Sequence, residues 1–309
     1  MLNKVVIFGV GLIGGSFARS LKKAGAVGSV VGMGRSAASL KRAQELGIID
    51  VIGVADAGGG GCTMAEALDG ADLVLLAAPV AQTEAILAAL APHLQPGTVV
   101  TDAGSTKCDV VASARRALGG KIAQFVPGHP IAGRETNGPE AAIDDLYVGK
   151  KVVLTALDEN AAVDVERVAA AWRACDAIIH RLTPQEHDKV FAAVSHLPHL
   201  LAYALVDDIA NKPHADLLFQ YAASGFRDFT RIAGSSPEMW RDISLANQSA
   251  LLTELDAYLA QLTGLRARLA AGDGAGLESV YSNAQRARHQ WITAIEAAEA
   301  PPNPANQGG

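Results

Sequence analysis

The stretch KVVIFGVGLIGGS, residues 4–16, decides the fold, because a continuous apolar run passes directly into a glycine-rich turn. Its glycines form a G-x-G-x-x-G pattern between a predicted strand and a predicted helix. In this pattern the first glycine permits a tight turn, the second lets the backbone approach a pyrophosphate, and the third lets the helix pack on the strand. The first N–H groups of the helix then face the phosphates. A turn that binds nothing is the alternative, but the position in an early βαβ unit favours dinucleotide binding. The predicted cofactor contacts in this loop are Gly9, Gly11, Leu12, Ile13 and Gly14.

Up to about residue 155, short apolar runs alternate with helical runs. The apolar runs are continuous, as expected for strands whose two faces are both covered by helices. This pattern predicts an α/β Rossmann fold, that is, a doubly wound and mainly parallel sheet. The predicted strands are 4–9, 29–33, 73–78, 98–102, 124–128 and 150–155, and the predicted helices are 12–24, 36–46, 80–91 and 107–118.

After about residue 157 the pattern becomes helical. Thr183 to Glu186 read as a capping box with proline at the first helical position, and we expect the helix that it opens to be interrupted near Pro198. Helical periodicity continues over 237–271 and 274–299. The predicted domains are a dinucleotide-binding domain over 1–157, an all-α domain over 158–299 that binds substrate and forms a homodimer, and a disordered tail over 300–309.

Composition limits the possible functions. The chain has 309 residues, half of them hydrophobic, which is enough for two domains with substantial cores. A net charge of −6 provides no basic field for nucleic acid. The three cysteines form no C-x-x-C pair, which indicates a reducing, cytoplasmic compartment. No run reaches the roughly 18 apolar residues of a membrane span, so we expect a soluble protein.

The end of the second predicted strand indicates which dinucleotide binds. NAD-binding units usually carry an acidic residue there, which accepts hydrogen bonds from the ribose hydroxyl. This chain has Arg35 and Ser36 and no acid at that place. A guanidinium binds a 2′-phosphate through two hydrogen bonds, whereas a carboxylate repels it. The sequence therefore predicts NADP, with NAD beside a surface arginine as the alternative.

Ligands of such sheets bind beyond the carboxyl ends of the strands, where three further loops emerge. The small apolar loop at Ala78 and Pro79 suits a nicotinamide ring. The loop after the next strand carries Ser105, Thr106 and Lys107, whose hydroxyls and amine are expected to face a polar substrate, unless Ser105 or Thr106 caps the following helix. The stretch VPGHPIAGRETNG, residues 126–138, holds His129 between a glycine and a proline. By position alone, His129 is expected close to the hydride donor or acceptor.

Five motifs occur together in this chain. They are GVGLIGGS, DAGSTK, PGHPIAGRE, SHLPHLLAYALVD and GFRDFTRIA with PEMWRDI behind it. In this order they resemble the prephenate/arogenate dehydrogenase family of tyrosine biosynthesis, over nearly all of residues 3–290. The resemblance implies a Rossmann domain followed by a helical domain that dimerises. It also implies oxidative decarboxylation without a metal, in which hydride leaves ring carbon C4 for the nicotinamide and the ring becomes aromatic.

The resemblance implies roles for individual residues as well. His129 accepts the hydroxyl proton, which suits a neutral imidazole near neutral pH. Arg231 binds a substrate carboxylate, because a guanidinium offers two parallel hydrogen bonds. Glu135 closes over the active site. Ser195 and His199, which share one face of a helix, reach the substrate.

Other readings stay open for several side chains. Asp228 either orients Arg231 or forms a structural ion pair, and Glu135 is alternatively a solvated loop carboxylate. Trp240 is expected to pack the wall of the site, and Arg134 has no assigned role. His196 and His199 have no nearby acid or cysteine to complete a metal site. The remaining histidines receive a structural interpretation: His93, His180, His187, His214 and His289.

Two other classes of protein compete with this interpretation. A β-hydroxyacid dehydrogenase or an imine reductase shares the Rossmann and helical organisation, but needs a differently placed lysine or acid. A non-catalytic dinucleotide sensor would use the glycine loop alone. Within the family, no residue decides between prephenate and arogenate.

Overall fold

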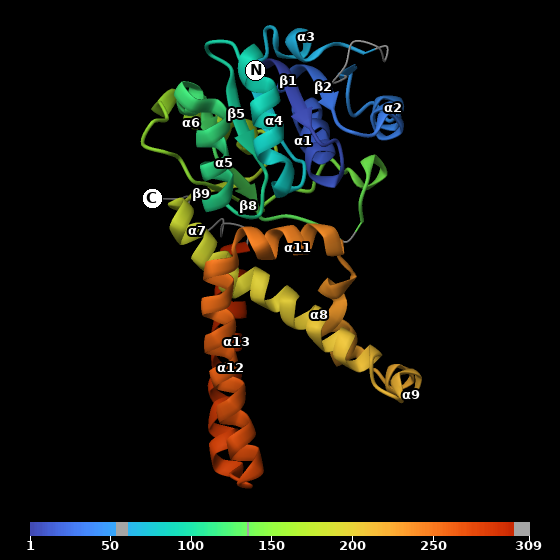
Figure 1. Cartoon of the computed structure of the whole chain (residues 1–309), viewed down its shortest axis with the longest axis vertical. Helices are drawn as coiled ribbons and strands as arrows, with labels where there is room; N and C mark the ends of the chain where they lie inside the picture. The colour runs from blue at the N-terminus through green and yellow to red at the C-terminus, as the bar shows by residue number, and fades with distance from the viewer. Residues whose placement is uncertain (54–60, 135, 300–309) are drawn as a thin grey trace, which may run out of the picture. The chain divides into compact units, whose positions relative to one another are not determined.

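The computed structural model describes residues 1–53, 61–134 and 136–299 (Figure 1). The chain divides into two compact units, residues 1–251 and residues 252–309. Glu135, and the tail over 300–309 for which we predicted disorder, lie outside the described residues.

A six-stranded parallel sheet forms the centre of the first unit, in the order β3-β2-β1-β4-β5-β6. Successive side chains along a strand point to opposite faces of the sheet. In β1, Val5 and Ile7 enter one core cluster, while Val6 and Phe8 enter the other. This burial of both faces explains the continuous apolar runs in the sequence. The strands are β1 Leu2–Phe8, β2 Val27–Met33, β3 Val51–Gly53, β4 Leu73–Leu76, β5 Val99–Asp102 and β6 Phe125–Val126.

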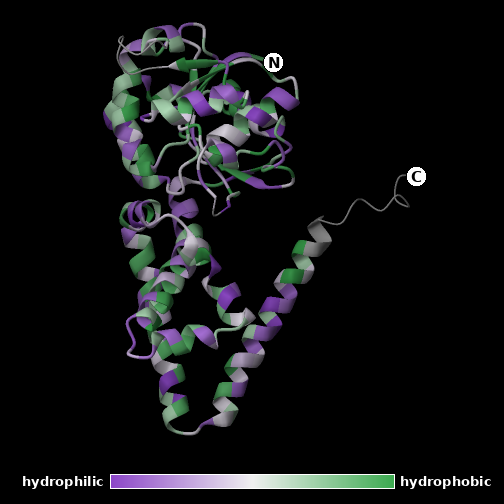
Figure 2. Ribbon diagram, turned by 90° about the vertical axis from the view of Figure 1, so that its right-hand side faces the viewer, coloured by the Kyte–Doolittle hydropathy of each residue, from purple (hydrophilic) through white to green (hydrophobic). Residues whose placement is uncertain are grey.

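Helices cover both faces of this sheet (Figures 1 and 2), which confirms the predicted doubly wound α/β fold. Buried side chains of α1, α2 and α6 join one core cluster, and those of α3, α4 and α5 join the other. Trp172 of α6 anchors the first cluster, with its ring centroid 4.5 Å from that of Phe17. The helices are α1 Leu12–Lys23, α2 Ala37–Glu45, α3 Met64–Leu68, α4 Thr83–Leu90, α5 Cys108–Leu118 and α6 Ala162–Arg173, and a 3-10 turn, η4, covers Pro139–Ala141.

A second, three-stranded sheet lies beyond the end of the first. It consists of β7 Gly128–Pro130, β8 Lys151–Leu154 and β9 Ile178–Arg181, with β7 antiparallel to β8 and β9 parallel to it. The prediction of one strand over 124–128 was therefore wrong, because the chain passes from β6 to β7 at Pro127, whose nitrogen has no hydrogen to donate. His129 therefore lies on strand β7, whereas the sequence predicts a loop at this position.

The structure keeps α6 and β9 with the nucleotide-binding half, although the sequence pattern assigned residues after 157 to the all-α half. β9 pairs with β8, and α6 buries Val165, Val168 and Trp172 in the core cluster of the first sheet. A short amphipathic helix followed by a four-residue strand resembles a helical run when it is judged by apolar periodicity alone.

The helical part begins with a long run of three segments: α7 Pro184–Phe191, a π-helical turn Ala192–His196, and α8 Leu197–Ala210. The predicted capping box is present, since Thr183 and Glu186 exchange side-chain and backbone hydrogen bonds. The predicted interruption near Pro198 takes the form of the π turn just before it. By length and composition this run, Pro184–Ala210, is apolar enough to cross a membrane, but core helices of soluble proteins pass the same test, and its first half packs beside the site described below.

Shorter helices complete the first unit. They are α9 Ala215–Gln220, α10 Ser224–Thr230 and α11 Pro237–Ala246, and a 3-10 turn, η6, covers Arg231–Gly234. The helix predicted over 237–271 is divided at Asn247, where the backbone leaves the helical region and α12 Gln248–Ala270 begins.

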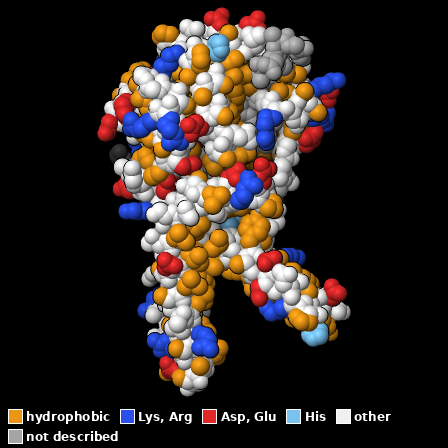
Figure 3. Space-filling model, viewed as in Figure 1, with side chains coloured by type: hydrophobic (Ala, Val, Ile, Leu, Met, Phe, Trp, Pro, Cys, Tyr) orange, Lys and Arg blue, Asp and Glu red, His pale blue; other side chains and the backbone are white. Residues whose placement is uncertain are grey.

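The second unit contains the rest of α12 from Leu252 and α13 Gly274–Glu299. These two helices expose large apolar side chains along their length, visible as orange atoms in Figure 3. The exposed members are Leu252, Leu259, Leu262, Leu269, Tyr281 and Trp291.

Candidate active site

A cavity of about 630 Å³ lies at the carboxyl edge of the parallel sheet, against the glycine loop. Gly9 has φ +93°, and a Cβ there would stand 2.6 Å from the carbonyl oxygen of Ala77. A Cβ on Gly14 would stand 2.2 Å from the oxygen of Gly9, whereas one on Gly11 would meet nothing within 4 Å. The first and third glycines are thus required by close packing, and the second faces open space where a pyrophosphate can approach. The loop fits a dinucleotide.

The cavity wall holds most of the predicted cofactor contacts. Gly9, Gly11, Arg35, Ser36, Ala78 and Pro79 line it. Leu12 instead packs in the core, and the carbonyl of Ile13 accepts a hydrogen bond from Tyr147 at 2.6 Å. For all of the residues named, contact with the cofactor remains a prediction.

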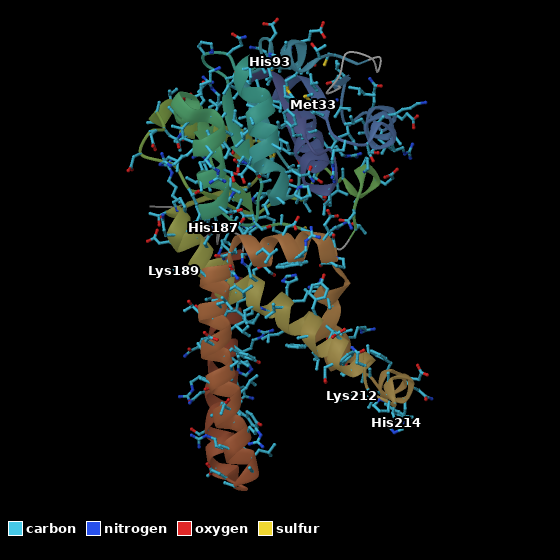
Figure 4. The ribbon with its side chains drawn as sticks, viewed as in Figure 1. Met33, His93, His187, Lys189, Lys212 and His214 are labelled. Carbon is cyan, nitrogen blue, oxygen red and sulfur yellow. The ribbon has the colours of Figure 1, made fainter. Side chains whose placement is uncertain are left out.

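One end of the cavity is formed by the start of α2, beyond Met33 at the end of β2 (Figure 4). Ser36 caps α2 by accepting a hydrogen bond from the backbone N–H of Ser39 at 3.2 Å. Arg35 stands beside it, and no carboxylate is among the described residues that line the cavity. The place where a ribose is expected is therefore lined by the hydroxyls of Ser36 and Ser39, the guanidinium of Arg35 and the N-terminus of α2.

His129 takes part in a series of hydrogen bonds that sequence analysis missed. Its Nδ1 shares a hydrogen bond of 2.8 Å with Nε2 of His187, and Nδ1 of His187 shares another of 2.8 Å with Oδ1 of Asp188. His187 and Asp188 are buried on α7, where Figure 4 labels His187. The sequence alone predicts a structural role for His187, because no motif includes it. The only signal in the sequence was the His-Asp pair one turn into a capped helix.

Asp188 also connects α7 to the loop after β5. Its carboxylate accepts hydrogen bonds of 2.8 Å from the backbone N–H groups of Lys107 and Cys108. Burial alone would raise the pKa of Asp188, but the hydrogen bonds from His187, Cys108 and Lys107 outweigh it, so that the pKa lies below its usual value. Asp188 is therefore an ionised acceptor at the end of the series.

A buried ion pair fixes the strand that carries His129. The Lys107 ammonium pairs with the Asp102 carboxylate and donates a hydrogen bond of 2.7 Å to the carbonyl of Gly128. The other Asp102 oxygen accepts a bond of 3.0 Å from the N–H of Gly128. We expected the Lys107 amine to face a substrate. That expectation was wrong, because the side chain is fully buried and supports β7. Ser105, in the same loop, is half-buried and does not cap α5.

A second group forms around His199. Its ring stacks on Trp240 with centroids 3.5 Å apart, and its Nδ1 shares a hydrogen bond of 2.8 Å with the backbone oxygen of Ser195. Burial lowers the pKa of His199, and the charge of Arg231 lowers it further, so the guanidinium lies near the imidazole. Trp240 forms a wall of this group, as expected. The structure thus brings Ser195, His199 and Arg231 together.

His196 lies between the two groups. It is fully buried, its ring meets Trp240 edge-on, and its Nδ1 shares a hydrogen bond of 3.1 Å with Asn247. Asn247 also donates to the backbone oxygen of Asp188 at 2.8 Å. Asn247 therefore joins the π turn to α7, which explains why the predicted helix is divided at this residue.

Several other residues considered in the sequence analysis do not belong to the groups described above around His129 and His199. His93 and His214 are distant from His187 in Figure 4, and their structural interpretation stays a prediction. Asp228 stands 4.0 Å from Arg227 at an exposed position. Among the described residues, no cluster of three or more His, Cys, Asp or Glu side chains is placed to hold a metal ion.

Comparison with known proteins identifies the family. A model described as the nucleotide-binding domain of prephenate dehydrogenase matches residues 17–181, and one described as its dimerization domain matches residues 183–282. The chain belongs to the prephenate dehydrogenase family. The first of these family domains includes α6 and β9, in agreement with their packing here.

Relatives in the family cover most of the chain. Cyclohexadienyl dehydrogenase of Zymomonas mobilis is 36% identical over 290 residues, which are 93% of this chain and 96% of that protein. Prephenate dehydrogenase of Bacillus subtilis is 34% identical over 293 residues, 92% of this chain and 75% of that protein. The solved structure of Aquifex aeolicus prephenate dehydrogenase with hydroxyphenyl propionate and NAD+ matches with a TM-score of 0.85 at 36% identity, over 94% of this chain and 98% of that one.

Proposed function

We propose that this chain is a nicotinamide-dependent dehydrogenase that oxidatively decarboxylates prephenate or arogenate. The observation that carries the proposal is the hydrogen-bonded series of His129, His187 and Asp188 at the edge of a sheet whose glycine loop fits a dinucleotide. Membership of the prephenate dehydrogenase family supports the same reaction.

His129 acts as the proton acceptor in this reaction. Its ring accepts the proton of the hydroxyl on ring carbon C4, and the O–H electron pair then supports departure of a hydride from the same carbon. The nicotinamide, when bound, accepts that hydride. The electron pair of the bond to the departing carboxylate enters the ring, CO₂ leaves, and the ring becomes aromatic. His129 then returns its proton to the oxygen, which becomes the phenol.

Arg231 and His199 hold the substrate's carboxylate side chain. A guanidinium offers a carboxylate two parallel hydrogen bonds, and the stacking on Trp240 keeps the nearby imidazole in one orientation. Ser105, Ser195 and Glu135 belong to the same substrate site in this proposal.

Replacing His129 by Asn tests the function. We expect His129→Asn to lower kcat by about 10³-fold, within the range that positioned acid–base groups contribute, while the cofactor dissociation constant stays within twofold. Turnover measured with prephenate and with arogenate reports kcat, and protein fluorescence titration reports binding. A non-catalytic sensor would bind the cofactor and show no turnover even as wild type, and undiminished turnover of the variant would refute the role of His129.

NADP is the proposed cofactor, with NAD as the alternative. The guanidinium of Arg35, the hydroxyls of Ser36 and Ser39, and the absence of a carboxylate among the described lining residues support a 2′-phosphate there. We expect Arg35→Asp to lower the ratio of kcat/KM for NADP over NAD by at least 20-fold, since it replaces an attractive charge by a repulsive one. An unchanged ratio in steady-state assays with the two cofactors would contradict this preference.

A homodimer in the cytoplasm completes the proposal. The match to a dimerization domain and the exposed apolar side chains of α12 and α13 support self-association through the helical half. Free thiols at Cys62, Cys108 and Cys175 suit a reducing compartment. Assays of the purified protein with each substrate and each cofactor distinguish prephenate from arogenate as the preferred substrate.

A further inference from the structure

His187 and Asp188 are both buried, and together with His129 they form a continuous series of hydrogen bonds. We infer that they are positioning residues which hold His129 in one tautomer, with the proton on Nδ1 and the lone pair on Nε2. This inference rests on the proposed function of His129 as proton acceptor, because only a ring nitrogen with a lone pair can accept a proton.

The direction of each hydrogen bond follows from the groups at the end of the series. The carboxylate of Asp188 already accepts two backbone N–H groups, from Lys107 and Cys108, and it can only accept from His187 as well. The proton of neutral His187 is therefore on Nδ1, and its Nε2 carries a lone pair. That lone pair accepts the hydrogen bond from His129, whose proton must then be on Nδ1.

The surroundings keep His187 neutral in the resting protein. Burial lowers the pKa of His187, and its hydrogen bond to Asp188 does not fully compensate. A protonated His187 would donate to Nδ1 of His129 and place the proton of His129 on Nε2, which would block the base. The neutral state of His187 thus preserves the lone pair needed for catalysis.

The same series stabilises the proton once it has been accepted. When Nε2 of His129 takes the hydroxyl proton, the ring holds two protons and one positive charge. The proton on Nδ1 then passes to Nε2 of His187, which becomes an imidazolium beside the Asp188 carboxylate. The reverse transfer restores the starting state as the phenol oxygen regains its proton, so no proton is gained or lost. The arrangement extends the histidine–carboxylate pair of hydrolases by a second imidazole.

Three variants separate positioning from packing. His187→Phe keeps a ring on α7 but removes the acceptor, and we expect kcat to fall about 100-fold while KM and the cofactor dissociation constant stay within threefold. His187→Gln offers an amide oxygen to Nδ1 of His129, and should recover at least tenfold of that loss. Phe191→Leu is the matched control: its ring centroid lies 5.0 Å from that of His129 without hydrogen bonding to it, and we expect less than a threefold change in kcat.

The tautomer itself is measurable without turnover. In the protein labelled with ¹⁵N at histidine, we expect the His129 signal to show a protonated Nδ1 and an unprotonated Nε2 near neutral pH, with the signal assigned by its loss in His129→Asn. In His187→Phe this tautomer should no longer dominate. A wild-type signal with the proton on Nε2, or equal loss of kcat in His187→Phe and Phe191→Leu, would overturn the inference. Failure of the proposed function would appear differently, as full turnover of His129→Asn.

Discussion

At the scale of single residues, His129 is neutral when it must act as a base. Burial lowers its pKa well below 6.5, and the nearby His187 and the Lys107 ammonium lower it further. Because a lowered pKa keeps the ring unprotonated until the pH falls well below 6.5, the base form is complete throughout the neutral range.

This protonation state predicts the acid side of the pH profile. The value of kcat/KM reports the essential groups of the free enzyme, so we expect it to stay level from pH 8 down to 6.5 and to fall only below that. Steady-state rates at saturating cofactor across this range provide the measurement. An acid-side midpoint at or above 6.5 would show that His129 does not experience the burial and charges described here.

The residues of the site were only partly predictable from the sequence. The sequence predicts Gly9, Gly11 and His129 because each belongs to a short local motif. His187 was missed because its contact with His129 joins β7 to α7 across 58 positions, and no local pattern records such a contact. Lys107 was placed wrongly for a similar reason, because its burial depends on Asp102 and on the start of β7.

At the scale of elements, the segment that follows His129 also forms part of the cofactor cavity. Gly138 and Pro139 line that cavity, and Glu140 in η4 forms an ion pair of 3.0 Å with Arg42 of α2. The pair joins η4 to the helix whose N-terminus carries Arg35 and Ser36. Cofactor binding and the position of η4 are therefore expected to depend on each other.

Removing this ion pair should weaken cofactor binding modestly. Both side chains are largely exposed, and solvent screens such pairs, so we expect Glu140→Gln to raise the cofactor dissociation constant only by roughly two- to fivefold, with kcat unchanged. Glu45→Gln is the control, since Glu45 also pairs with Arg42 but does not belong to η4. Fluorescence titration with NADP and NAD measures the constant, and equal values for Glu140→Gln and wild type would contradict the coupling.

The elements show where prediction of the fold succeeded and where it did not. The parallel strands were found because burial on both faces gives continuous apolar runs. The break between β6 and β7 was not predicted, because no local pattern shows that pairing with β5 ends before Pro127 and that the chain after it pairs with β8. β9 was missed because a four-residue strand with one apolar pair, Ile178 and Ile179, carries little periodic signal.

At the scale of the whole molecule, the proposed dimer gives the exposed apolar residues of the helical half a role. Leu259 and Leu262 of α12 are 50% and 41% exposed, unusual for leucines that lie on one helix with several other exposed apolar side chains. Covering them with a second copy of the chain removes this apolar surface from water.

Charge on this surface should therefore separate the subunits. We expect the double variant Leu259→Glu and Leu262→Glu to sediment as a monomer at concentrations where the wild type is a dimer, because burying two carboxylates without partners costs several kcal/mol. Gln261→Glu adds a negative charge on the same turn at an exposed polar position and is expected to leave the dimer intact. Sedimentation velocity measures the state of each protein, and circular dichroism checks that the helices persist. A double variant that remains dimeric would place the interface on another face of the helical half.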